Sequence, residues 1–179
     1  WNESVPAAGR SGNLDGLAAY SRRDGHATRN ESDIVDSMPN DWDSDALLLK
    51  GALRIDAANR LELSADFYRR TNDTSFHGWD TNSTVITENS QQHSKTARNT
   101  VQLTHQWTPN NAWADLADSR LYFQSTDTED TTDTTTLATN AGVRHVSENE
   151  TGTWGLSSVV TKRLDRHHLS YGINASTQD

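Results

Sequence analysis

The sequence predicts an all-β fold, an antiparallel up-and-down meander of about seven strands. Apolar and polar residues alternate with a period of two in one stretch after another, which is the pattern of strands with one apolar face. No stretch shows a convincing helical period. Short and long connections follow each other in strict alternation along the chain. The alternation is visible at residues 14–28, 47–55, 60–70, 98–107, 119–126, 154–161 and 169–176. The last four strands are expected to run somewhat longer, over 93–107, 115–128, 145–163 and 168–177.

Among the first three expected strands, the third shows the alternation of apolar and polar residues most clearly. The strand at 14–28 is weaker, and its two faces are ambiguous. The strand at 47–55 carries leucines and an isoleucine on one face, and the tight turn DAAN joins it to 60–70. In that third strand one face is wholly apolar and the other is polar and charged. Its apolar face consists of Leu61, Leu63, Ala65 and Phe67.

The last four strands form two pairs, each joined by a short turn. The segment TPNNAWA connects 93–107 with 115–128, and its proline and two asparagines are turn-forming residues. The segment LDRH connects 145–163 with 168–177. The alternation is clean in these strands except at Val159, which interrupts a polar face.

The other connections are expected to be long and polar, at residues 29–42, 71–92 and 129–143. The stretch TDTEDTTDTTT at 126–136 is interpreted as a low-complexity loop. Tight turns would then gather at one end of the sheet and large loops at the other. A sandwich with Greek-key crossings would mix loop lengths instead.

The composition sets a second constraint. Apolar residues make up 32% of the 179-residue chain, against roughly 45–50%, glycine included, in soluble globular domains. A compact soluble core would be thin. Either much of the chain is disordered, or its apolar residues share a face that something outside the chain covers.

Charge and residue content exclude several classes of protein. The net charge is −9 with a pI near 5.1, which disfavours a nucleic-acid partner because such a partner requires a basic face. The chain has no cysteine, hence no disulfide framework. No apolar run approaches the ~18 residues of a membrane-spanning helix. The chain begins at Trp1 without a signal-peptide pattern, so we expect a mature or internal segment.

An outer-membrane β-barrel reconciles these features. Such barrels alternate short periplasmic turns with long extracellular loops, and apolar outward with polar inward side chains. Lipid then covers the apolar face, and backbone groups pair between strands. Seven strands with free edges would not close, so we expect the segment to belong to a larger barrel. Trp107, Trp113 and Tyr171 are candidates for an interfacial aromatic girdle at the short-turn end.

The strands also resemble a known family. The stretches LAAYSRRDG (17–25), LLLKGALRIDAANRLELSADFYRR (47–70), DSRLYFQST (118–126) and HHLSYGIN (167–174) are similar to TonB-dependent outer-membrane receptors, in particular the haem and haemoglobin receptor branch. The resemblance implies that residues 1–179 are one segment of a barrel of about 22 strands, without its plug and remaining strands. The segment FRAP…NPNL and its neighbouring histidine, typical of the haem branch, do not occur here.

By that resemblance the protein is a transporter and no enzyme, in the outer membrane of a Gram-negative bacterium. It would take up haem or a haem protein as an iron source, with energy from the TonB complex acting through the plug. Its partners would be outer-membrane lipid, TonB and the ligand. Haem would be cargo, and no resident cofactor, metal site or catalytic constellation is expected.

One candidate ligand site lies in the expected loop at 71–92, where Phe76, His77 and Trp79 could contact porphyrin and its iron. The alternative is a small cluster that packs on itself. Two other functions remain open. One is a siderophore or other nutrient receptor of the same architecture. The other is a soluble surface β-rich binding module whose apolar faces are buried by a second sheet across ~10 Å.

Overall fold

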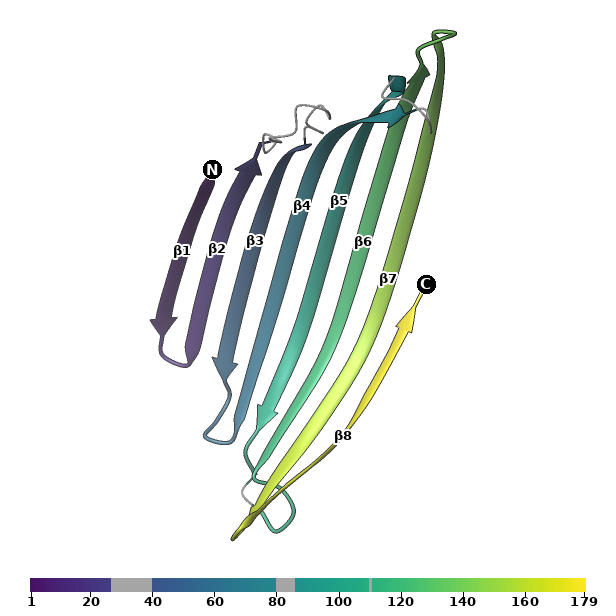
Figure 1. The fold of residues 1–179 in the computed structure, drawn as a ribbon. Coiled ribbons are helices and arrows are strands. Elements are labelled where there is room, and N and C mark those ends of the chain that lie inside the picture. Colours follow the sequence, from purple (N-terminus) through teal and green to yellow (C-terminus); the bar gives the residue numbers. More distant parts are fainter. Residues whose placement is uncertain (27–39, 80–85, 110) are drawn as a thin grey trace.

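A computed structural model of the chain describes residues 1–26, 40–79, 86–109 and 111–179, which form one antiparallel sheet of eight strands in sequence order (Figure 1). The all-β meander predicted from the sequence is confirmed. Within the described residues there is no helix, and therefore none that could cross a bilayer. The strands are β1 Asn2–Ser11, β2 Leu14–Gly25, β3 Asn40–Arg54, β4 Asn59–Trp79, β5 Ile86–Trp107, β6 Leu116–Thr136, β7 Ala141–Leu164 and β8 His167–Gln178.

Strand β1 was not predicted, because its sequence contains Pro6 and few β-branched residues. Gly12 and Asn13 turn the chain into β2, and Gly12 has a φ of 59°. A Gly-Asn pair between two strands is a hairpin signal that could have revealed β1. Trp1 and Asp24 exchange both backbone hydrogen bonds. Counting by alternation from that pair, the Pro6 nitrogen points away from β2, where no ladder hydrogen bond is lost.

Two of the expected long loops prove to be strand. Residues 71–79 continue β4 and residues 86–92 begin β5, with pairing as far as Trp79 opposite Ile86. In the same way, β6 continues to Thr136 and β7 begins at Ala141. The predicted loops at 71–92 and 129–143, and the low-complexity loop at 126–136, are therefore wrong over most of their length. Most of the loop predicted at 29–42 lies outside the described residues.

The physical reason is that these polar stretches are rich in threonine. Threonine is β-branched and suits a pleated strand, and its hydroxyl can bond across the sheet. Ser90 and Thr134 do so at 2.9 Å. Polarity and low complexity predicted loops here, although both are also compatible with a solvated strand ladder.

The short turns were predicted correctly. In DAAN, one carboxylate oxygen of Asp56 accepts hydrogen bonds from the backbone N–H groups of Ala58 and Asn59 at 2.7 and 2.8 Å. In TPNNAWA, the Asn111 side chain accepts from the N–H of Ala114 at 2.8 Å. In the LDRH turn, Asp165 adopts a φ of 43°. In the first two turns a side-chain oxygen thus accepts from local backbone N–H groups, and in the third a residue adopts a left-handed backbone conformation.

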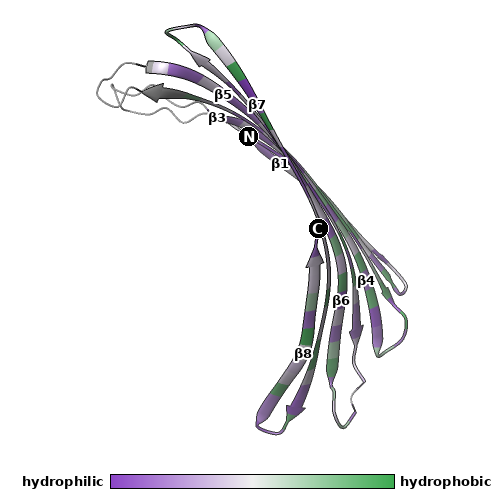
Figure 2. Ribbon diagram, turned by 90° about the vertical axis from the view of Figure 1, so that its right-hand side faces the viewer, coloured by the Kyte–Doolittle hydropathy of each residue, from purple (hydrophilic) through white to green (hydrophobic). Residues whose placement is uncertain are grey.

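Strand register sorts the side chains onto two faces. Directly opposite residues of neighbouring strands point to the same side of a sheet, and successive residues alternate. The only buried hydrophobic residues among those described are Ala52, Ala114 and Ala117. The sheet, drawn edge-on in Figure 2, therefore has no hydrophobic core of its own within the described residues.

Candidate functional site, an exposed apolar face

A row of four leucines crosses the middle of the sheet. Leu63, Leu103, Leu121 and Leu156 lie directly opposite one another on β4, β5, β6 and β7. They point to the same face, and their exposed fractions run from 43% for Leu156 to 55% for Leu63. Four aligned leucines that remain exposed mark a surface that the described residues do not cover.

The adjacent rows extend this surface across all the described strands. In one of them Phe123 and Trp154 are cross-strand partners, and their ring centroids are 4.7 Å apart. We call the whole surface the apolar band. Besides the leucine row, its large exposed members are Val5, Leu14, Tyr20, Leu49, Leu53, Phe67, Val101, Trp154, Tyr171 and Ile173.

The apolar band is large for a soluble protein. Contiguous apolar patches on soluble monomers rarely exceed a few hundred Å², and larger ones mark a protein or membrane contact. Figure 2 shows the hydrophobic segments mainly in the lower part of the sheet, toward the short turns, while hydrophilic segments prevail above. The band is therefore limited along the strands as well as to one face.

A charged row borders the apolar band on the side away from the short turns. Asp45 receives a hydrogen bond from Tyr20, a member of the band, and lies 3.8 Å from Arg22. On the next row, Lys95 and Glu129 form an ion pair at 3.5 Å. Charged groups at this level would lie in water or at lipid headgroups if the band met hydrocarbon.

Aromatic residues border the band on the short-turn side. The rings of Trp107 and Trp113 meet edge to face with centroids 6.1 Å apart. Tyr171 donates its hydroxyl to the carbonyl oxygen of Trp113 at 3.3 Å. The structure thus brings together the three aromatic residues singled out as girdle candidates.

The turn beside these aromatic residues is held by a network that the sequence did not reveal. Lys162 donates to the carbonyl oxygen of Asn111 at 2.7 Å and to the carboxylate of Asp115 at 2.6 Å. Ala114, the last residue of this turn, is fully buried. The hydrogen bond from Lys162 is the main cause that lowers the pKa of Asp115.

The opposite face is polar and carries charges of both signs, as the alternation indicated. Glu62 lies 3.7 Å from Lys50 and 3.4 Å from Arg60. Farther along, Asp66 lies 3.7 Å from Arg98. The pairs Glu62–Lys50 and Asp66–Arg98 cross strands, whereas Glu62 and Arg60 lie on the same strand, so the polar face is partly neutralised within the sheet. We call this side the polar face.

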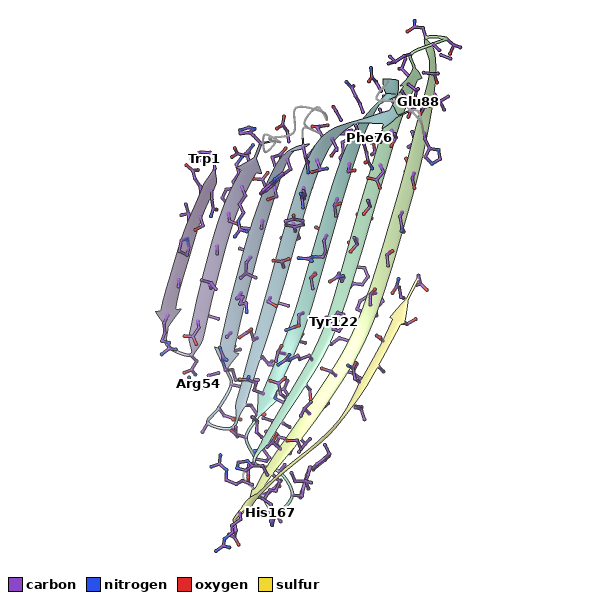
Figure 3. All side chains as sticks on the ribbon, in the orientation of Figure 1. Trp1, Arg54, Phe76, Glu88, Tyr122 and His167 are labelled. Carbon is purple, nitrogen blue, oxygen red and sulfur yellow. The ribbon has the colours of Figure 1, made fainter. Side chains whose placement is uncertain are left out.

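The predicted ligand residues lie on β4 and not in a loop. The backbone pairs Phe76 with Ser90 and His77 with Asn89, and Trp79 is opposite Ile86. Phe76 lies near the upper end of the sheet in Figure 3, away from the short turns. The side chains of His77 and Trp79 fall outside the part of the chain that the structure describes. Among the described residues, no group of three or more His, Asp or Glu could hold a metal ion.

A hollow lies on the same face as the apolar band, at its charged border, and nothing in the sequence indicated it. It has a volume of about 660 Å³ and is lined by acidic residues of β6 and β7 together with Arg69 and Lys95. Asp127 lies directly opposite Glu150, and Glu129 directly opposite Glu148. Only the register shows these like-charge pairs, because the partners are far apart in the sequence.

The comparisons with protein families and with curated proteins found no relative of this chain: no protein-family model matches it, and no curated protein matches it.

Proposed function

We propose that this chain is a wall segment of an outer-membrane β-barrel, part of a TonB-dependent receptor that takes up haem or haem-protein iron. The exposed apolar band on one face of a sheet whose other face is polar carries the membrane part of the proposal. The resemblance of four strand stretches to such receptors carries the transport part.

The dimensions of the apolar band support a bilayer as its cover. On β4 the apolar side chains of the band run from Leu61 to Phe67, and the row of Asn59, opposite Trp107, belongs to the aromatic border. Band and border row together span residues 59–67, close to the ~9–11 residues in which a tilted barrel strand crosses the hydrocarbon. The strand continues to Trp79, so its upper half would project beyond the membrane. Charged residues begin where the band ends on that side, and aromatic residues gather on the other, as in the outer surface of such barrels.

The free energy gained by burying apolar side chains favours a cover that extends over the whole apolar band. Burying one Val, Leu, Ile or Phe side chain stabilises by ~1.5–3 kcal/mol. Because the side chains of the band are only about half exposed, the gain over the whole band is on the order of 10–20 kcal/mol, as large as the ~5–15 kcal/mol net stability of an ordinary domain. A sheet that left this face in water would forgo its largest stabilising contribution.

The position of the band can be tested by labelling, since the described chain has no cysteine. The full-length protein would carry Leu63→Cys or Ser64→Cys, each coupled to an environment-sensitive fluorophore in liposomes. We expect nitroxide-labelled lipid to quench the probe at 63 strongly and the probe at 64 weakly, because neighbouring residues point to opposite faces. Equal quenching, or a folded protein that ignores liposomes, would contradict the membrane proposal.

The ligand is tested separately. Haem binding and haem-dependent growth would be compared for the wild type and for Phe76→Ala and His77→Ala, with His145→Ala as a control on β7. We expect the first two variants to bind haem about tenfold more weakly, which corresponds to ~1.4 kcal/mol, and the control to behave as wild type. No haem binding by the wild type would leave the membrane proposal standing and favour a receptor for another nutrient. Unchanged haem binding in both variants would show that Phe76 and His77 do not form the haem site.

A further inference from the structure

A polar niche lies on the polar face, toward the end away from the short turns. It spans β3 to β6, has a volume of about 350 Å³, and is lined by Asn40, Arg70, Asn72, Ser94, Thr96 and Asp130. The register explains the grouping. Arg70 lies opposite Thr96, Asn72 lies opposite Ser94, and Ser94 lies opposite Asp130.

The niche contains an orphaned acceptor. The Asn72 side-chain oxygen is buried and has no hydrogen-bond partner, and it is the only such atom among the described residues. Its amide nitrogen donates to Thr74 at 3.0 Å, which fixes the orientation of the group. A buried acceptor without a donor costs ~1–3 kcal/mol, so a ligand that supplies a donor would be stabilised there.

The charged groups of the niche are also unpaired within the described residues. The Arg70 guanidinium lies 5.1 Å from the centroid of the Trp42 ring, and no carboxylate lies within ion-pair distance of it. Asp130 likewise has no cationic partner among those residues. The niche therefore offers donors from a guanidinium and hydroxyls, and acceptors from a carboxylate and an amide oxygen.

This combination selects a particular ligand chemistry. Arg70 would attract a phosphate or carboxylate ligand, but Asp130 would repel it. Asp130 would attract a cation, but Arg70 would repel it. A sugar hydroxyl is both donor and acceptor, so one neutral molecule with several hydroxyls can satisfy both kinds of group. The volume is at the lower end of the ~300–1,000 Å³ of small-molecule pockets, which suits one or two sugar rings.

We propose that this niche binds a neutral saccharide, with Asn72 and Asp130 accepting from its hydroxyls and Arg70 donating to them. The site is distinct from the apolar band and from the ligand residues Phe76 and His77 proposed for haem. It adds a second ligand class, and it does not depend on the membrane or haem proposals.

Saturation-transfer NMR on the purified full-length protein would test the site, with maltose, lactose, cellobiose and chitobiose as probes. We expect saturable binding of at least one of them. Asn72→Leu and Asp130→Ala should each weaken that binding about tenfold. Asn174→Leu, a matched exchange on the same face in β8, should leave it unchanged.

Three results would overturn the proposal. They are no saturable binding of any of the four sugars, binding that the niche variants all retain, and tighter binding of glucose 6-phosphate than of any neutral sugar. If Asn72→Leu fails to fold, Arg70→Lys provides the test, because lysine keeps the charge but loses the planar donor fork. Failure of the liposome labelling would not affect this experiment, so the two proposals fail separately.

Discussion

Asp56 shows how one side chain shapes a turn. Its carboxylate accepts hydrogen bonds from the backbone N–H groups of Ala58 and Asn59 and from the Asn59 side chain. These bonds stabilise the ionised form, so the pKa of Asp56 lies below its usual value, chiefly through the Ala58 N–H. The turn between β3 and β4 should therefore depend on pH.

The direction follows from the lowered pKa. The stabilisation is present above the unfolded-state pKa of aspartate and is lost as the pH falls through the lower, folded-state pKa. We expect the amide of Ala58 to exchange faster, relative to its intrinsic rate, as the pH falls below about 4. In Asp56→Asn this dependence should vanish. Hydrogen exchange followed by mass spectrometry would measure it, and an equal pH dependence in both proteins would contradict the role.

At the scale of elements, the long strands β6 and β7 contain both stabilising and destabilising cross-strand pairs of charged residues. Arg144 donates two hydrogen bonds to Asp133, both at 2.7 Å, and they lower the pKa of that carboxyl. Lower in the same ladder, Glu129 lies opposite Glu148. Like charges directly opposite each other destabilise a sheet.

Replacing Glu148 by lysine should relieve that repulsion. We expect Glu148→Lys to stabilise the protein by roughly 0.2–1 kcal/mol, with a gain that shrinks at high salt because screening weakens surface charges. Thermal unfolding at low and high salt would measure it. Glu88→Lys is the matched control, since Glu88 lies opposite Thr136. A gain of equal size in the control would show that net charge, and not the pair, is responsible.

At the scale of the whole molecule, the apolar band requires a cover that the described residues do not supply. Under the proposal that a bilayer covers the apolar band, a charged side chain introduced there should destabilise the protein more than one introduced on the polar face. Leu63 lies in the leucine row at the middle of the band, and its neighbour Ser64 points to the polar face.

The inequality can be measured directly. In the full-length protein, Leu63→Arg should destabilise the folded, membrane-inserted state by ~2–4 kcal/mol, the penalty for arginine near the bilayer midplane. Ser64→Arg should have little effect. Folding into liposomes over a denaturant series would measure both. Equal effects of the two substitutions would contradict the proposal, because they would show that the apolar band is no more buried than the polar face.

Sequence periodicity was reliable where one face is apolar and the other polar. The alternation in 60–70 predicted its strand and both faces, and DAAN predicted the turn before it, because local chemistry dictates both. It failed for β1, where Pro6 and small residues weaken the pattern. It failed again for 71–79 and 129–136, where both faces are polar and period two leaves no trace. Phe76 was therefore assigned to a loop although it belongs to a strand.

By itself, the sequence determined the all-β class, the meander order and the apolar side of the central strands, because these follow from short-range alternation and turn chemistry. Only the tertiary structure decided what lies side by side across the sheet. The leucine row, the contact of Trp107 with Trp113, the facing acids Glu129 and Glu148, and the niche around Asn72 all depend on register. Register follows from turn geometry together with the hydrophobic patterns of both paired strands, so it becomes visible only when residues distant in the chain are paired.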